Sequence, residues 1–189
     1  MCIRDSCPAT ARDAKGLLKS AIRDNNPVLF FEHKFLYRRI KEELPADDFT
    51  VPIGQAAVRR DGRDLTIVSY AAMVHTSLQA AAELAQEGIE AEVIDLRTLL
   101  PLDRETILAS VRKTNKLLVV HEDTRTGGIA GEIAAIVMES AFEDLDGPVR
   151  RVTSLDTPVP YAPGLEDYFM PNAAKVIAAA RELARYSGK

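Results

Sequence analysis

Residues 91–121, AEVIDLRTLLPLDRETILASVRKTNKLLVVH, determine the fold class of this 189-residue chain. The two ends of the stretch, 91–96 and 116–121, are short apolar runs, typical of strands that are buried on both faces of a sheet. Between them, 104–113 carries apolar residues at helical spacing, and Asp103 stands just before it in the N-cap position. A strand, a helix and a second strand in this order predict a parallel βαβ unit.

The same alternation continues on both sides of this unit. Further strands are predicted at 53–59, 65–70 and 149–153, and further helices at 73–87, 129–142 and 173–185. The sequence Asp61-Gly62 predicts a tight turn that joins the first two strands. We therefore expect residues 51–189 to form a three-layer α/β/α sandwich around a mainly parallel sheet.

A shorter helix and strand precede this domain. Residues 13–23 (DAKGLLKSAIR) have the spacing of a helix, with Asp13 as its cap. Residues 28–31 (VLFF) predict a buried strand of a parallel sheet. Residues 32–50 are charged and have no sustained period, which indicates a loop-rich linker with one helical turn near 39–44.

The opening residues 1–11 (MCIRDSCPATA) have no convincing period and abut a well-formed helical pattern. We expect them to be a non-native or truncated end. They contain both cysteines of the chain, Cys2 and Cys7, which have no partner elsewhere and form no CxxC pair. The sequence therefore predicts neither a disulfide framework nor a zinc site.

The composition indicates an ordinary globular protein, with 47% hydrophobic and 28% charged residues. The net charge is −4, and acidic and basic residues are interspersed, which argues against nucleic acid or a membrane surface as a partner. No apolar run approaches the roughly 20 residues that cross a bilayer. We therefore expect a cytoplasmic protein whose partners are small molecules and other proteins.

Polar residues follow the predicted strands at the ends where ligands and interfaces gather in parallel sheets. They are Tyr70, Asp95, Arg97, His121, Glu122, Asp123 and Asp156. His121 lies beside two carboxylates and could shuttle protons near neutral pH. A structural or interface role is favoured for this cluster, because adjacent residues of an extended segment point to opposite sides.

The glycine-rich segment 126–131 (TGGIAG) joins a strand to a helix and admits two interpretations. Backbone amides at a helix N-terminus bind anions, but the segment lacks both the GxGxxG and the GxxxxGK[ST] pattern. Close packing of the helix on the strand is the favoured interpretation. Of the other histidines, His75 is predicted to be a partly buried packing residue, and His33 lies in the linker among charges.

A third candidate site is the turn Ala21-Ile-Arg-Asp-Asn-Asn26, where the first helix ends. The last carbonyl oxygens of a helix lack intrahelical partners, and here they lie within a few residues of the Asp24 carboxylate and two asparagine amides. Such oxygens could bind a hard cation. Asparagine also ends helices for conformational reasons alone, so both interpretations remain open.

Four segments in order resemble one family: DAKGLLKSAIRDNNPVLFFEHKFLYR (13–38), VPIGQAAVRRDGRDLTIVSYAAMVH (51–75), EVIDLRTLLPLDRETILASVRKTNKLLVVHEDTRTGG (92–128) and RVTSLDTPVPYAPGLEDYFMPN (151–172). They are similar to the beta subunit of thiamine-diphosphate-dependent pyruvate and branched-chain 2-oxo acid dehydrogenases. The phrases FEHKFLYR and HEDTRTGG are closer to branched-chain or broad-specificity members.

The resemblance implies a domain plan and a cofactor. Residues 12–31 would be the tail of a pyrimidine-binding domain, 32–50 a linker, and 51–189 a transketolase-type C-terminal domain. The family's catalytic glutamate and histidine would lie upstream, and its diphosphate and magnesium motif on the alpha subunit. No catalytic or cofactor-binding residue is therefore expected here. The resemblance also implies a structural potassium ion at Ala21, Ile22, Asp24 and Asn26.

The implied activity is decarboxylation of a 2-oxo acid with thiamine diphosphate and magnesium, followed by acyl transfer to a lipoyl group. Expected partners are the alpha subunit, a second beta subunit and a dihydrolipoyl acyltransferase core. Apolar residues of segment 158–171 could contact such partners or pack on their own domain; they are Val159, Tyr161, Tyr168 and Phe169. This part alone is expected to be inactive and to associate. The alternatives are a non-catalytic assembly fragment, or part of acetoin dehydrogenase or deoxyxylulose-phosphate synthase.

Overall fold

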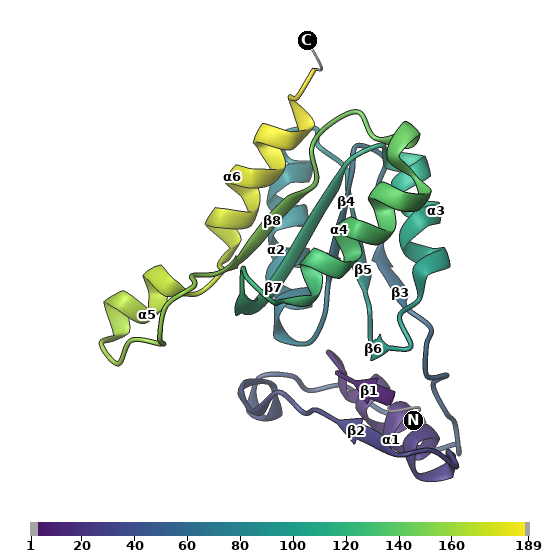
Figure 1. The fold of residues 1–189 in the computed structure, drawn as a ribbon. Coiled ribbons are helices and arrows are strands. Elements are labelled where there is room, and N and C mark those ends of the chain that lie inside the picture. The colour runs from purple at the N-terminus through teal and green to yellow at the C-terminus, as the bar shows by residue number, and fades with distance from the viewer. Residues whose placement is uncertain (1–3, 188–189) are drawn as a thin grey trace.

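The structure is a computed structural model and describes residues 4–187. A five-stranded sheet in the order β3-β5-β4-β7-β8 forms its centre (Figure 1). The strands are β3 (Ala57–Arg60), β4 (Leu65–Ser69), β5 (Ala91–Asp95), β7 (Leu117–Thr124) and β8 (Arg150–Ser154). All neighbours are parallel except β3, which runs antiparallel to β5. The prediction of a mainly parallel sheet is confirmed.

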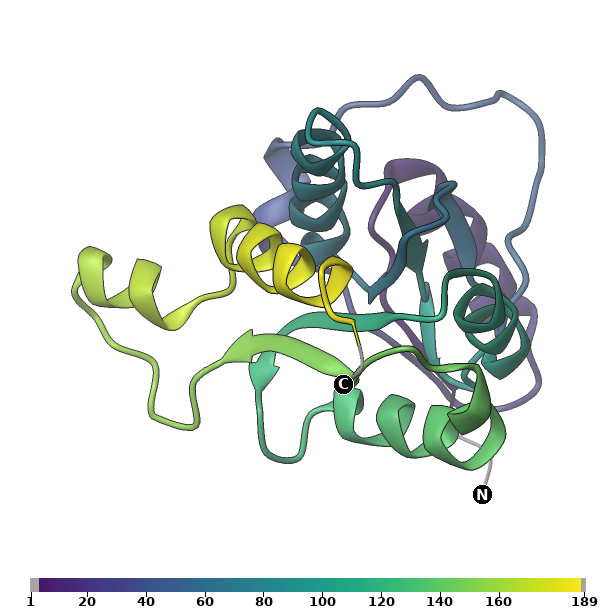
Figure 2. The same ribbon diagram turned by 90° about the horizontal axis from the view of Figure 1, so that it is seen from above.

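Helices cover both faces of this sheet (Figure 2). They are α2 (Ala72–Ala85) and α6 (Ala173–Ala184) on one face, and α3 (Arg104–Thr114) and α4 (Ile129–Ser140) on the other. Ile67 packs into the first core and its neighbour Val68 into the second, and both are fully buried. Burial of each such side chain stabilises the folded state by roughly 1.5–3 kcal/mol. The continuous apolar strands thus reflect burial on both faces, and the predicted three-layer sandwich is confirmed.

Asp61 and Gly62 lie between β3 and β4 as predicted, but the two strands do not pair with each other, because β5 lies between them in the sheet. After β3 the chain crosses the start of β5, where the amides of Arg63 and Asp64 donate to the Glu90 carbonyl oxygen at 2.9 and 3.0 Å. Gly62 makes this crossing possible, since a Cβ there would lie 2.1 Å from the nearest backbone atom of β5. A turn sequence alone does not distinguish a hairpin from such a crossing.

A smaller sheet is built from the residues that precede the sandwich. Strands β1 (Arg4–Ser6) and β2 (Val28–Phe30) are parallel, and β6 (Thr98–Leu100) adds to β1 in the antiparallel sense. Helix α1 (Ala11–Arg23) connects β1 to β2. We call β1, α1 and β2 the N-terminal module. Part of the segment expected to be non-native thus forms a strand; residues 1–3 lie outside the described part of the chain.

Two details of the N-terminal module differ from expectation. Thr10, not Asp13, is the N-cap of α1: the Asp13 amide donates to Thr10 Oγ1 at 3.1 Å, and this hydroxyl donates to the Asp13 carboxylate at 2.9 Å. Strand β2 is not buried: Leu29 is 48% exposed, and Phe31, which directly follows the strand, is 54% exposed. Within the described chain, β2 is the outer strand of the small sheet and pairs only with β1.

The linker packs along α1. It contains the short helix η1 (Lys34–Arg38), slightly earlier than the predicted turn. Farther on, the Phe49 ring lies 4.9 Å from Lys15 Nζ, and the Ser20 hydroxyl donates to the Val51 carbonyl at 2.6 Å. Gly16 leaves room for this contact, because a Cβ there would lie 2.5 Å from Val51 Cγ2.

Two short helices were not predicted: η2 (Phe142–Asp144) and α5 (Pro163–Phe169). Helix α5 belongs to segment 158–171, here called the arm, which projects away from the sandwich in both views (Figures 1 and 2). Lys175 Nζ donates to the Met170 carbonyl at 2.6 Å and holds the base of the arm. No helix within residues 4–187 is long and apolar enough to cross a membrane.

Candidate functional site

The candidate site lies at the edge of the sheet where β4, β5, β7 and β8 end, here called the carboxyl edge. The N-terminal module packs against this edge (Figure 1). The strand-end residues predicted from the sequence all follow or end these strands, but the structure divides them among separate contacts. Only some of them face one another.

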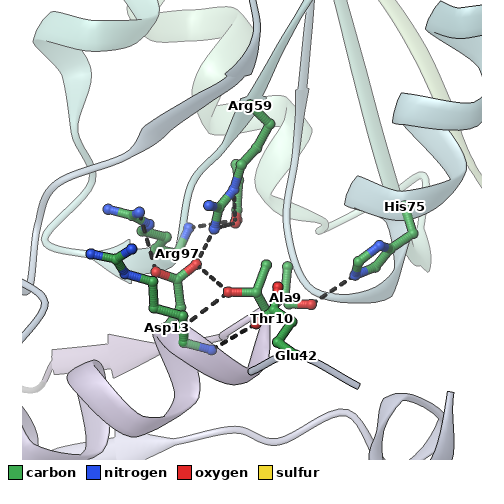
Figure 3. A network of polar contacts seen from close by, with 9 residues as sticks. Ala9, Thr10, Asp13, Glu42, Arg59, His75 and Arg97 are labelled. Atoms are coloured by element: carbon green, nitrogen blue, oxygen red, sulfur yellow. Dashed lines mark hydrogen bonds and ion pairs between the residues drawn. The ribbon is translucent and has the colours of Figure 1, made fainter. Parts of the chain in front are cut away.

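The largest contact is a buried ionic network between the sandwich and α1 (Figure 3). Arg59 Nη2 lies 2.7 Å from Asp95 Oδ2 and also pairs with Asp13. Arg97 Nη2 lies 3.1 Å from the other Asp13 oxygen, and its backbone amide donates to Asp95 Oδ1. Both aspartates are at most 1% exposed. Two carboxylates are thus held between two guanidinium groups.

Burial and ion pairing shift the pKa of Asp95 in opposite directions. Burial raises the pKa of Asp95, and the Arg59 charge and hydrogen bonds oppose that shift. Removing one partner from such a buried pair is strongly destabilising, because it leaves an uncompensated charge. Asp95 and Arg97 were singled out from the sequence, whereas Arg59 and Asp13 were missed as their partners. No local pattern connects a strand residue to a helix residue 46 positions away.

His121 is fully buried beneath the start of α4. The Ala130 amide lies 3.4 Å from its Nε2, and a Cβ on Gly128 would lie 2.5 Å from its Cε1. Burial lowers its pKa, which keeps the ring neutral. The geometry favours the structural role over proton shuttling, and it favours close packing as the reason for the glycine-rich segment.

Glu122, the residue after His121, contacts the linker instead of α4. Its Oε2 lies 2.6 Å from His33 Nε2, and both side chains are a little under 30% exposed. A second histidine of the same edge, His75, contacts the Ala9 carbonyl through Nε2 at 2.7 Å (Figure 3). His75 is therefore a partly buried contact residue, as predicted. No local pattern indicates the partner of His33, which lies 89 positions away.

Asp156 closes the loop after β7. It accepts the Thr126 amide at 2.9 Å and the Thr126 hydroxyl at 2.7 Å. These hydrogen bonds lower its pKa, so the carboxylate is the favoured form. This contact fixes two loops relative to each other and requires no ligand.

The predicted cation turn is closed by its own hydrogen bonds. Asp24 Oδ1 accepts both the backbone and the side-chain amide of Asn26 at 2.8 Å, and these contacts lower the pKa of Asp24. The Asp24 amide donates to the Ala21 carbonyl at 3.3 Å, and the Ile22 side chain is exposed. Arg4 Nε lies 2.8 Å from the other carboxylate oxygen and supplies a positive charge. Within residues 4–187, no three histidine, cysteine or carboxylate side chains gather as a metal site.

A family model, the transketolase C-terminal domain, matches residues 54–176. The chain belongs to this family. The match runs from just before β3 through the arm to the start of α6, and it confirms the predicted transketolase-type C-terminal domain.

The chain is also similar over most of its length to the beta subunits of three enzymes. The chain is 54% identical over 180 residues to the 2-oxoisovalerate dehydrogenase subunit beta of Bacillus subtilis, covering 95% of this chain and 55% of that protein. It is 51% identical over 176 residues to an acetoin:2,6-dichlorophenolindophenol oxidoreductase subunit beta of Cupriavidus necator, covering 93% and 52%. It is 48% identical over 179 residues to the pyruvate dehydrogenase E1 component subunit beta of Bacillus subtilis, covering 95% and 55%. The chain spans about half the length of these transketolase-family relatives.

A solved structure supports the fold across both parts of the chain. A split-gene transketolase, described as an inactive beta4 tetramer, superposes with a TM-score of 0.79 at 27% identity. The match covers 96% of this chain and 57% of that one. The N-terminal module and the transketolase C-terminal domain are therefore both represented in that structure.

Proposed function

We propose that this chain is the C-terminal portion of the beta subunit of a thiamine-diphosphate-dependent 2-oxo acid dehydrogenase. The assembled enzyme would decarboxylate a 2-oxo acid and transfer the acyl group to lipoyl. The observation that carries the proposal is the 54% identity to a 2-oxoisovalerate dehydrogenase beta subunit over nearly the whole chain. A cytoplasmic location is part of the same proposal.

The described residues do not fit thiamine diphosphate and magnesium by themselves. The diphosphate and its magnesium ion need several oxygen donors around one point, and the described residues offer no such cluster of carboxylates. His121 packs beneath the start of α4, and Asp156 joins two loops through Thr126. We therefore assign no catalytic step to this region and place the cofactor on the alpha subunit and on the other half of the beta subunit.

The contribution of this region would be assembly. Its partners would be the alpha subunit, a second beta subunit and the acyltransferase core. The arm supports this proposal, because Val159, Tyr161 and Tyr168 are each more than 60% exposed on a projecting segment. Phe169 is only 5% exposed and packs on its own domain, so we do not include it among the residues that would contact a partner.

We also propose that the turn at Ala21, Ile22, Asp24 and Asn26 binds potassium in the assembled subunit. The helix-end carbonyl oxygens and the Asp24 carboxylate fit such an ion, while Arg4 competes for the carboxylate. The test is the melting temperature in KCl and in NaCl at equal ionic strength, for the wild type and Asp24→Ala. A higher melting temperature in KCl that is lost in D24A is expected. Equal melting temperatures would refute the site.

The activity is tested by mixing this chain with a cognate alpha subunit and thiamine diphosphate and supplying a panel of 2-oxo acids. We expect decarboxylation only when the full-length beta subunit replaces this chain. Activity with the chain itself would show that essential residues lie within it. Acetoin, which has no carboxyl group to lose, is tested separately by reduction of 2,6-dichlorophenolindophenol, because an acetoin oxidoreductase beta subunit is 51% identical.

A further inference from the structure

An open groove of about 840 Å³ lies between the linker and the arm. Residues of η1 and the two residues after it line one side, and residues of the arm and of the start of α6 line the other. The first two turns of α2 also contribute to it. Apolar side chains are part of the lining, among them Leu36, Met73 and Met170. The groove is therefore a surface with two distinct sides and an apolar component.

The side formed by η1 is basic. Residues 34–41 (KFLYRRIK) contain four basic residues and no acidic one. All four are exposed, and none of them forms an ion pair with a carboxylate within residues 4–187. Arg39 lines the groove, and its Cζ lies 3.9 Å from the centre of the Phe35 ring, which is itself 54% exposed. This side therefore presents positive charge and an aromatic ring to solvent.

The side formed by the arm is acidic. Residues 158–171 contain Glu166 and Asp167 and no basic residue. Both carboxylates line the groove, both residues are exposed, and neither forms an ion pair in the described part of the chain. Lys175 at the base of the arm donates to the backbone carbonyl oxygens of Tyr168 and Met170 instead. Within one chain, the two sides of the groove thus carry opposite charges that do not neutralise each other.

This charge pattern is self-complementary. Two identical chains related by a two-fold axis present the same surface to each other. If the axis runs along the groove, the arm of each copy faces η1 of the other, and opposite charges meet twice. If the axis runs across the groove, arm faces arm and like charges meet, which costs free energy. A different partner of one charge sign would be attracted to one side of the groove and repelled by the other. The pattern therefore favours a second copy of the chain and selects the orientation of the axis.

We propose that this groove binds a second copy of the chain in a two-fold dimer. The arm carboxylates of each copy lie against the guanidinium groups of Arg38 and Arg39 of the other, and the exposed Phe35 ring becomes covered. The inference rests on the proposed function in one respect, because it assigns a surface to the second beta subunit named there. It does not depend on the dehydrogenase activity.

Sedimentation velocity of the 189-residue chain over a range of concentrations tests the dimer. Every chain carries Leu29→Lys, because a lysine on an exposed edge strand opposes association through β2. We expect a dimer whose Kd rises with salt, since salt screens exposed charge pairs. Glu166→Lys/Asp167→Lys and Arg38→Glu/Arg39→Glu, each tested alone, should raise the Kd by at least about tenfold, because like charges then meet in both contacts. A chain that stays monomeric at every concentration overturns the inference.

Mixing the two variants tests which surfaces meet. In an equimolar mixture each arm meets an η1 of opposite charge, so we expect a heterodimer with a Kd close to that of the chain with unchanged charges. Glu139→Lys/Glu143→Lys is the matched control, since it makes the same change in net charge at two exposed residues of α4 and η2. It should neither weaken the dimer nor form a heterodimer with the Arg38→Glu/Arg39→Glu variant.

Failure of the two variants to recombine, or an equal effect of the control, overturns the assignment of the groove. Loss of binding to an alpha subunit in these variants, with no dimer of the chain itself, would assign the groove to that subunit and likewise overturn it. Because the readout is mass in solution and not decarboxylation, failure of the dimer and failure of the proposed activity are distinguishable.

Discussion

Replacing Asp13 by asparagine tests whether the ionic network holds the N-terminal module on the sandwich. The substitution keeps the size of the side chain but removes the carboxylate that pairs with the Arg97 guanidinium, and it leaves Arg59 with one carboxylate, Asp95, instead of two. Breaking a fully buried ion pair costs about 3–5 kcal/mol. The two arginines are 21% and 18% exposed and partly hydrated, so we expect a loss of about 2–3 kcal/mol in the free energy of unfolding.

Urea unfolding followed by circular dichroism measures this loss, and native-state hydrogen exchange locates it. The amides of α1 should lose protection more than those of β4 at the centre of the sheet. Asp61→Asn is the matched control, because the Asp61 side chain is 96% exposed and 4.0 Å from its nearest cation. It should change stability by less than about 0.5 kcal/mol. If D13N and D61N have the same effect, the network does not fasten the module.

Three further outcomes follow from other contacts of the structure. Gly128→Ala should lower stability by about 1–3 kcal/mol in thermal melts, because the new methyl group would overlap the His121 ring; a neutral effect would mean that α4 shifts freely. Lys19 and Arg23 hold the pKa of Asp48 at about 2, so their stabilising contribution is complete above pH 3.8 and is lost as pH falls toward 2. When the free energy of unfolding is measured against pH, an Asp48→Asn variant should lack the loss of stability between pH 3.8 and 2 that this carboxylate causes in the wild type. Identical profiles for the two proteins would contradict the prediction. Leu29→Lys on the exposed side of β2 should reduce the association expected of this chain in light scattering, and unchanged association would place the contact elsewhere.

Local patterns predicted the elements whose signal lies within one segment. The cap of α3 is an example: Asp103 accepts the Thr106 amide at 3.0 Å, as its position before an apolar-periodic run indicates. The apolar runs of β5 and β7 likewise identified strands buried on both faces, because burial on both faces removes the alternation of polar residues.

Features that depend on pairing over long distances were missed. Strands β1 and β6 are three residues each and exist because they pair with one another across more than 90 positions. The crossing at Gly62 has the sequence of a hairpin turn, and only the packing of β5 beneath it decides the path. The same limit applied to the site: the strand-end residues were found from the sequence, but their partners Asp13, Arg59 and His33 were not.

The arm has a consequence for the thermodynamics of assembly. Helix α5 is already folded, and Lys175 ties the base of the arm to α6, while several apolar side chains of the arm still face solvent. A partner that docks on the arm therefore has no helix to fold, and most of the conformational entropy of that segment has already been lost. Preorganised segments of this kind gain affinity by lowering the ordering cost of binding. Association through the arm should accordingly be accompanied by little change in helix content.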